Sequence, residues 1–171
     1  MKRAASMAAF ALAQAPVLAA AHETQAGGGA AAILGRLHMA LVHFPVALIL
    51  MAAVAELLCI TRRDGRYSDV ARFMITAGAW ISIPAAATGF FRADTITMND
   101  AEQSLFAIHR VAGIATPVLV FLCAGLAEGV RRSGQIWELF LFRAVLLLAA
   151  VSAAVAGYVG GEIVFGIFPL W

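Results

Sequence analysis

The chain has 171 residues, of which 63% are hydrophobic and 13% are charged, and its formal net charge is +2. Soluble domains are about half apolar and about a quarter charged, so this composition excludes a soluble globular enzyme and a disordered chain. The chain has no run of basic residues that would neutralise a phosphate backbone, so nucleic acid is not an expected partner.

The N-terminal segment has the features of an export signal. A basic start at Lys2 and Arg3 precedes an alanine-rich apolar stretch, which ends in an A-x-A cleavage pattern at residues 19–21. We expect a signal peptide over residues 1–21, cleaved in the mature protein, with an uncleaved anchor as the alternative. Residues 22–36 are expected to form a flexible periplasmic lead-in.

Four long apolar segments follow, and each is long enough to cross a hydrocarbon core of ~30 Å as a helix of about 20 residues. Because the bilayer core offers no water to backbone polar groups, α-helices are the expected form. The predicted fold is an all-α integral membrane four-helix bundle over residues 37–171, with no recognisable internal repeat. Its spans are expected at about residues 37–61, 72–92, 106–127 and 139–160.

The connections between the spans differ in charge, which predicts the orientation. The second connection, residues 92–105, carries more acidic than basic side chains. Arginines gather in the other two connections: Arg62, Arg63, Arg66 and Arg72 in the first, and Arg131 and Arg132 in the third. The positive-inside rule places these two in the cytoplasm. We therefore expect a protein of the bacterial inner membrane with a periplasmic N-terminus, as the export signal also predicts.

Ionisable side chains inside a membrane are costly and indicate function. The candidates are His38 and His43 in the first span and His109 at the start of the third. His43 lies 19 residues before Arg62, and His109 lies 19 residues before Glu128, which predicts a similar depth for these two rings. His38 would lie about 7.5 Å further out at helical rise.

Two neutral imidazoles at one depth on facing helices form the axial ligand set of a b-type haem. We therefore predict His43 and His109 as ligands of haem iron, with His38 as a substitute ligand or a hydrogen-bonding group on the quinol side. Arg92 and Arg110, at the outer rim, are predicted to pair with the haem propionates.

Other interpretations of these side chains stay open. The histidines can serve as interfacial hydrogen-bonding groups, as a proton relay or as ligands of another metal such as copper. Glu56 is placed to reach the inner arginines or to carry protons, and Glu162 to cap the outer rim or to bond to a histidine. Cys59 and Cys123 form no CxxCH pattern, which excludes covalent haem attachment.

The motif His38-Met-Ala-Leu-Val-His43-Phe-Pro resembles the start of the first span in a bacterial membrane-protein family called domain of unknown function 2231. The resemblance extends over about residues 36–168 and includes His109 and the stretches 84–89 and 160–165. Members are often encoded beside, or fused to, c-type cytochrome modules, so the resemblance implies membrane electron transfer.

Two positions depart from the family pattern. Met39 stands where the family usually has proline, and Ile167 and Phe168 stand where it tends to carry a further histidine. If that histidine is a ligand in relatives, we expect this chain to hold fewer cofactors or to use only His43 with His109.

The expected function is that of a b-type haem-binding electron-transfer protein or subunit, which passes electrons between quinol and a periplasmic cytochrome. One alternative is a non-catalytic assembly or anchoring subunit of a larger respiratory complex. The second alternative, a small proton-coupled transporter, is less favoured because no repeat is recognised.

Overall fold

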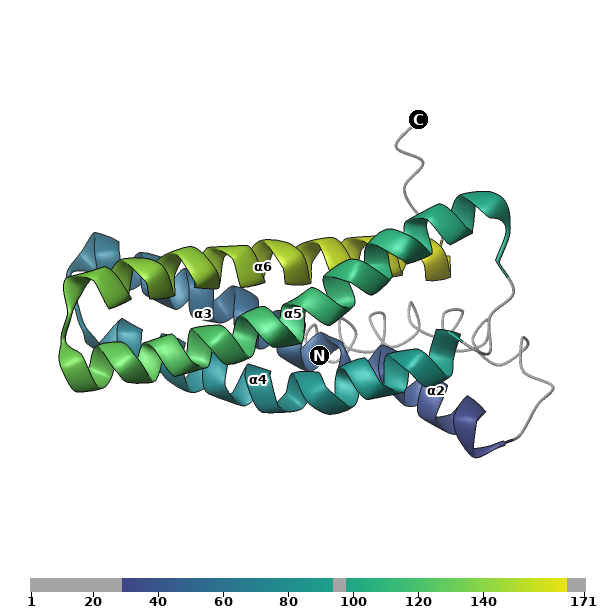
Figure 1. Ribbon diagram of the computed structural model, residues 1–171, viewed down its shortest axis with the longest axis horizontal. Helices are drawn as coiled ribbons and strands as arrows, with labels where there is room; N and C mark the ends of the chain where they lie inside the picture. The colour runs from purple at the N-terminus through teal and green to yellow at the C-terminus, as the bar shows by residue number, and fades with distance from the viewer. Residues whose placement is uncertain (1–28, 94–97, 166–171) are drawn as a thin grey trace, which may run out of the picture.

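The computed structural model describes residues 29–93 and 98–165, and every regular element in this part of the chain is an α-helix. The all-α prediction is confirmed, whereas the predicted signal peptide lies outside the described residues. Figure 1 shows the helices in chain order: α2 (Ala30–Leu41), α3 (His43–Arg62), α4 (Arg66–Ala93), α5 (Asp100–Ser133) and α6 (Ile136–Phe165).

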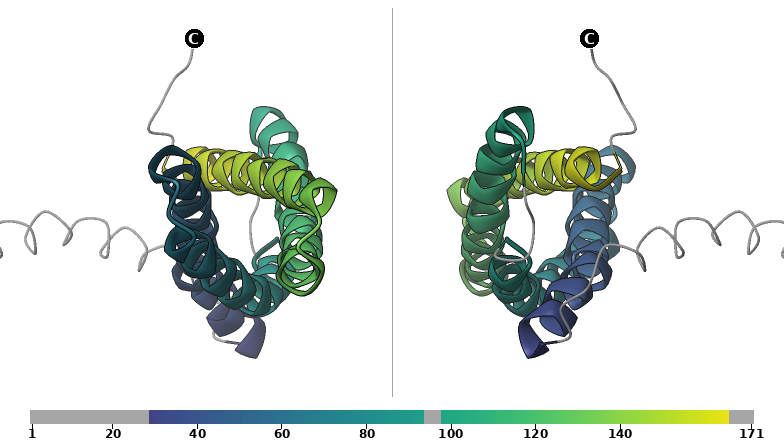
Figure 2. Two further views of the ribbon diagram at one scale, coloured as in Figure 1. Left: turned by 90° about the vertical axis from the view of Figure 1, so that its left-hand side faces the viewer. Right: turned by 90° about the vertical axis from the view of Figure 1, so that its right-hand side faces the viewer.

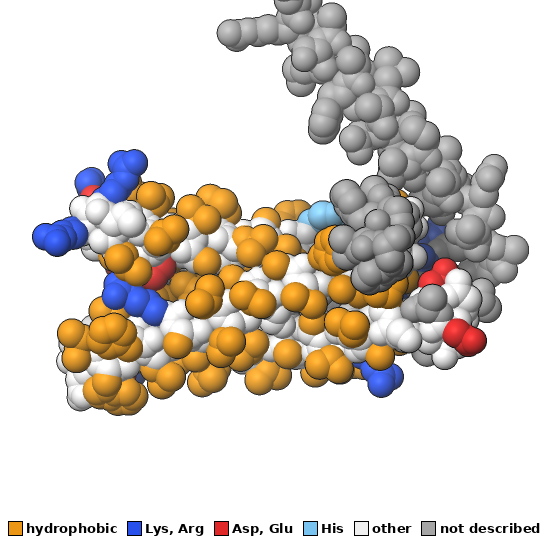
Figure 3. Space-filling model, turned by 90° about the horizontal axis from the view of Figure 1, so that it is seen from above, with side chains coloured by type: hydrophobic (Ala, Val, Ile, Leu, Met, Phe, Trp, Pro, Cys, Tyr) orange, Lys and Arg blue, Asp and Glu red, His pale blue; other side chains and the backbone are white. Residues whose placement is uncertain are grey.

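Four helical segments are long and apolar enough to cross a membrane: Ala32–Arg62, Arg66–Ala93, Glu102–Ser133 and Ile136–Phe165. Large hydrophobic side chains cover their outer surface, among them Phe73 and Trp80, which are 73% and 65% exposed. Figure 3 shows this apolar coat along the bundle, with most of the visible Lys and Arg side chains at one end. Exposing so large an apolar surface to water is unfavourable, so the outer surface of the helices is the one that contacts lipid.

The interior is built mainly from small side chains. Ala52, Ala79, Ala149 and Ala153 are almost completely buried, and Ile49, Ile75 and Val120 fill the space between them. Small residues allow membrane helices to approach closely, and dispersion contacts then stabilise the association.

The first span is interrupted at Val42, so that α2 and α3 are separate helices. Pro45 has no N–H with which to bond to Leu41, and the helix is locally disrupted. Val42 keeps near-helical angles, with φ −62° and ψ −26°, so the chain continues in roughly one direction. α2 begins at Ala30, which corrects the expectation of a flexible segment up to residue 36, because the alanine-rich sequence there favours a helix.

The four long helices surround a common core in the order α3, α4, α5, α6, and α2 lies against α4 (Figure 2). The α3–α4 and α5–α6 turns lie together at one end of the bundle. We call it the arginine end, because Arg62 and Arg63 lie at the first turn and Arg131 and Arg132 at the second. Each first helix of a hairpin ends there in a left-handed residue, Arg63 with φ 54° and Gly134 with φ 65°. These two residues are 71 positions apart.

The same spacing of 71 residues relates many buried positions of the first hairpin to the second. Buried positions recur at this interval: Ala71 and Phe142, Ile75 and Leu146, Gly78 and Ala149, Ala79 and Ala150, Ser82 and Ala153, Ile49 and Val120, Ala52 and Cys123, Glu56 and Ala127. The contacts between hairpins match as well, since α4 packs on α5 as α6 packs on α3. The two hairpins are therefore equivalent at these positions, as expected of an internal duplication, which the sequence analysis missed.

Candidate functional site: a histidine pair between the two hairpins

His38 is the first member of a histidine pair that the fold brings together. Its ring Nδ1 lies 2.8 Å from the carbonyl oxygen of Ala85 on α4, and the Thr88 hydroxyl lies 3.5 Å from the same nitrogen. A carbonyl oxygen only accepts hydrogen bonds, so Nδ1 carries the proton and donates it.

His109 on α5 makes the same contact with the other hairpin. Its Nδ1 lies 2.9 Å from the carbonyl oxygen of Ala156 on α6. In both cases the carbonyl is 47 residues further along the chain. The two histidines are themselves 71 residues apart and are thus equivalent residues of the duplication.

The two rings lie next to each other across the boundary between the hairpins, in a T-shaped arrangement. Their centroids are 6.3 Å apart and their planes are at 83°. With Nδ1 protonated, each neutral ring presents Nε2 as a lone-pair donor, and no described residue bonds to either Nε2 atom. The arrangement can hold one metal centre or share one proton.

A glycine supports each ring. A β-carbon on Gly89 would lie 3.0 Å from Cε1 of His38, and one on Gly160 would lie 2.9 Å from Cε1 of His109. Real β-carbon contacts are almost never shorter, so a side chain at either position would push the ring away. Each glycine lies one helical turn beyond the carbonyl that its histidine uses.

His43 does not belong to this pair, because its side chain is exposed on the outside of the bundle. Five residues turn a helix by about 140°, so His43 faces outward when His38 faces inward. The expected pairing of His43 with His109 is therefore replaced by the pairing of His38 with His109. The depth count failed because it treated Glu128 as the counterpart of Arg62, whereas the duplication matches Arg62 with Ser133.

The two predicted rim arginines lie in different surroundings. Arg92 is partly buried on α4, one turn beyond Thr88, and its backbone lies against α2, where a β-carbon on Gly35 would be 3.2 Å from the Arg92 Cα. Arg110 is exposed. Arg92 is therefore partly buried beside α2, the helix that carries His38, whereas Arg110 is not.

Glu56 has a partner that the sequence analysis did not predict. Its side chain is 4% exposed, and its Oε1 accepts a hydrogen bond of 2.8 Å from Nε of Arg143 on α6. Glu56 therefore does not reach toward the arginines of the first turn. On α6, Glu162 is half-buried near Gly160, with no partner for its Oε1 among the described residues.

Residues 36–167 match a family whose description is "Predicted membrane protein (DUF2231)". The chain belongs to this family. The match covers most of the chain and confirms the resemblance seen in the motif of the first span. No curated protein matches the chain, and no solved structure does. The description of the family states its membrane nature alone.

Proposed function

We propose that His38 and His109 are the two axial ligands of a b-type haem and that the protein transfers electrons within the membrane. The single observation that carries the proposal is the close approach of two equivalent, partly buried imidazoles from opposite hairpins. Ionisable residues that face the interior of a membrane bundle are retained for function.

The separation of the rings supports one metal between them. A metal held by both rings would need the two Nε2 atoms directed at one point, and the centroid separation of 6.3 Å would leave room for it. The Nδ1 bonds to Ala85 and Ala156 are the second-shell contacts that orient ligating histidines and raise their basicity.

The donor set favours haem over a bare metal ion. No group of three or more histidine, cysteine, aspartate or glutamate side chains that could hold a metal occurs among the described residues. Haem iron needs two protein ligands, because the porphyrin supplies the other four donors. When bound, such a group supplies reversible one-electron transfer, and the protein sets its potential through ligation and burial.

Arg92 is the residue we assign to a haem propionate. It is partly buried and lies on α4 beyond Thr88 and Gly89, next to the His38 ring. A guanidinium forms strong charge-assisted bonds to a carboxylate. Arg110 is exposed and is left out of the proposed site.

The charges of the turns and the position of the histidine pair along the bundle indicate the electron-transfer partners that we propose. The arginine end would face the cytoplasm by the positive-inside rule, which puts the histidine pair near the periplasmic side of the inner membrane. Electrons would pass between quinol in the bilayer and a periplasmic cytochrome. The duplication removes one argument against a transporter, but Arg143 neutralises Glu56, the inner carboxylate that a proton-coupled transporter would use.

The test is a reduced-minus-oxidised visible spectrum of the purified full-length protein, expressed with added haem precursor. We expect Soret and α bands in the wild type, loss of both in His38→Ala and His109→Ala, and full retention in His43→Ala. His43 is the matched control because it lies five residues from His38 and is exposed.

A folded but colourless wild type would contradict the proposal and favour the assembly role. Bands that survive in both His38→Ala and His109→Ala would contradict the assignment of the ligands. Replacing Arg92 by glutamine should leave both bands in place and shift the reduction potential downward, because it removes a positive charge near the centre.

A further inference from the structure

The two hairpins differ at one pair of equivalent arginines near the arginine end. Arg143 on α6 and Arg72 on α4 are 71 positions apart and equivalent. Arg143 bonds to Glu56, whose equivalent position opposite Arg72 is Ala127. Arg143 therefore has a buried carboxylate as its partner, whereas the equivalent position beside Arg72 carries only the methyl group of Ala127.

A one-residue shift in α5 explains the missing carboxylate. The second hairpin does contain a glutamate, Glu128, next to Ala127. One residue turns a helix by about 100°, so Glu128 points outward. There it accepts bonds from Arg131 and Arg132 and is not available to Arg72.

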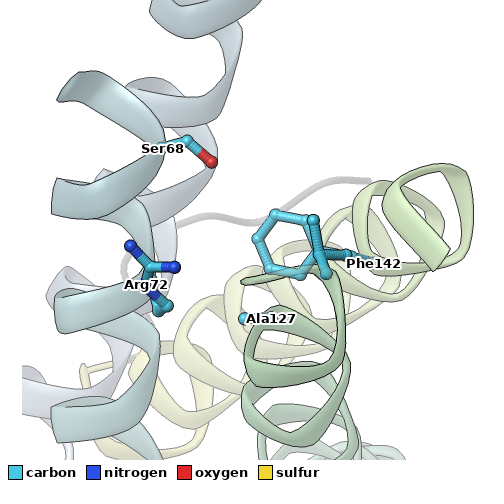
Figure 4. Close-up of a pocket in the computed structure, with 5 residues that line it drawn as sticks. Ser68, Arg72, Ala127 and Phe142 are labelled. Carbon is cyan, nitrogen blue, oxygen red and sulfur yellow. The ribbon is translucent and has the colours of Figure 1, made fainter. Parts of the chain in front are cut away.

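The space beside Arg72 is a cavity of about 20 Å³ between α4, α5 and α6. Its lining consists of Ser68, Arg72, Ala127, Val130 and Phe142. Figure 4 shows Ser68 and Arg72 on one helix, facing Ala127 and Phe142. A cavity of this size admits about one oxygen-sized group.

The Arg72 guanidinium has donors to spare toward this cavity. Its side chain is 27% exposed, and its described contact is an ion pair from Nη2 to Asp69, whose side chain is 69% exposed. Nε and Nη1 have no partner among the described residues. In Arg143 the equivalent Nε is the atom that binds the carboxylate oxygen.

We infer that Arg72 and Ser68 bind the phosphate of an anionic phospholipid at the gap between α4 and α5. The Glu56–Arg143 pair shows, within the same molecule, that this arginine position takes an anionic oxygen. Arg72 lies six residues from the start of α4, about 9 Å along the axis, within reach of the headgroup layer for a long side chain. Basic pockets between membrane helices bind anionic headgroups in this way.

The inference does not depend on haem or on the histidine pair. It is tested by titrating the purified full-length protein in a neutral detergent with phosphatidylglycerol or with phosphatidylcholine of the same acyl chains. Bound lipid is counted by native mass spectrometry. We expect the wild type to prefer phosphatidylglycerol, and Arg72→Gln to bind it about fivefold more weakly, the effect of one arginine at an anionic surface.

Two further variants make the result specific. Arg66→Gln is the matched control, since Arg66 lies on the same helix, is exposed and pairs with Asp64. It should keep wild-type binding. Ala127→Glu should lose the preference while Arg72 is still present, because an internal carboxylate would occupy the guanidinium as Glu56 does in the other hairpin.

Equal binding of the two lipids by the wild type would overturn the inference. Equal losses in Arg66→Gln and Arg72→Gln would also overturn it, because they would indicate diffuse attraction. Competition by millimolar inorganic phosphate would show that the ligand is the free ion and not the lipid. If Arg72→Gln does not fold, undiminished phosphatidylglycerol binding by Ala127→Glu is itself sufficient to reject the site.

Discussion

Gly89 and Gly160 occupy equivalent positions in the two hairpins, and each leaves room for the imidazole ring that lies against it. Neither ring can move aside freely, because Nδ1 of each is bonded to the carbonyl one helical turn earlier. The glycines are thus as much a part of the site as the histidines. They also recur with the 71-residue spacing, which ties the site to the duplication.

Replacing either glycine by alanine should destabilise the protein. The new methyl group would meet a ring carbon at about 3 Å, and overpacking of this kind costs about 1–3 kcal/mol. The measurement is the free energy of unfolding in one detergent, with Gly113→Ala as the control. A β-carbon on Gly113 meets nothing within 4 Å, so that variant should be neutral or more stable by up to about 1 kcal/mol. Equal stability of all three variants would refute the packing role.

The membrane architecture could be predicted from sequence because the bilayer allows few solutions. Apolar length and the need for internal backbone hydrogen bonds leave helices as the expected form, and the structure has them. The choice between His38 and His43 could not be made from depth. Counting residues gives the position of a histidine along the membrane normal. Contact between two histidines also depends on which side of its helix each one faces, and the count needs reference residues that lie at the same depth in both helices.

The duplication had a signal in the sequence, but the signal is out of register. Pro45-Val46 with Ala55-Glu56 resembles Pro117-Val118 with Ala127-Glu128 at a spacing of 72 residues. The buried positions and the histidines repeat at 71. A better signal is the pattern of a histidine followed 47 residues later by an alanine and 51 residues later by a glycine, which holds for both His38 and His109.

The partly buried ion pair between Glu56 and Arg143 should behave as a coupled unit. Arg143→Ala leaves the buried Glu56 carboxylate uncompensated and should cost about 3–5 kcal/mol of unfolding free energy, whereas Glu56→Ala should cost less because water reaches the Arg143 guanidinium. The double variant Glu56→Leu with Arg143→Met should be more stable than either single variant, because it buries no lone charge. Additive losses in the double variant would contradict this coupling.

The control for that cycle is the exposed ion pair of Glu128 with Arg131 at the arginine end. Exposed pairs contribute about 0–1 kcal/mol. Glu128→Gln should therefore change the unfolding free energy much less than Arg143→Ala does. A loss at Glu128 as large as that at Arg143 would show that burial is not the reason for the effect.

The start of α5 depends on a reciprocal cap. The Asn99 side chain accepts a hydrogen bond of 2.9 Å from the Glu102 backbone N–H, and the Glu102 carboxylate accepts one of 3.0 Å from the Asn99 backbone N–H. Asn99→Ala should cost about 0.5–2 kcal/mol, whereas Asn99→Asp should keep the cap. Amide hydrogen exchange over residues 100–104 is the measurement, and equal exchange rates in both variants would argue against the cap.

The orientation of the bundle can be tested with single cysteines in a background without the native thiols. Gly65, Gln135 and Gln103 are all exposed, the first two in the turns of the arginine end and the third near the start of α5. We expect Gln103→Cys to react with a membrane-impermeant maleimide in cells with a permeabilised outer membrane, because the positive-inside rule puts the arginine end in the cytoplasm. Gly65→Cys and Gln135→Cys should react only in inverted membrane vesicles. The reverse labelling pattern would place the histidine pair on the cytoplasmic side, and a periplasmic cytochrome could then not be its direct partner.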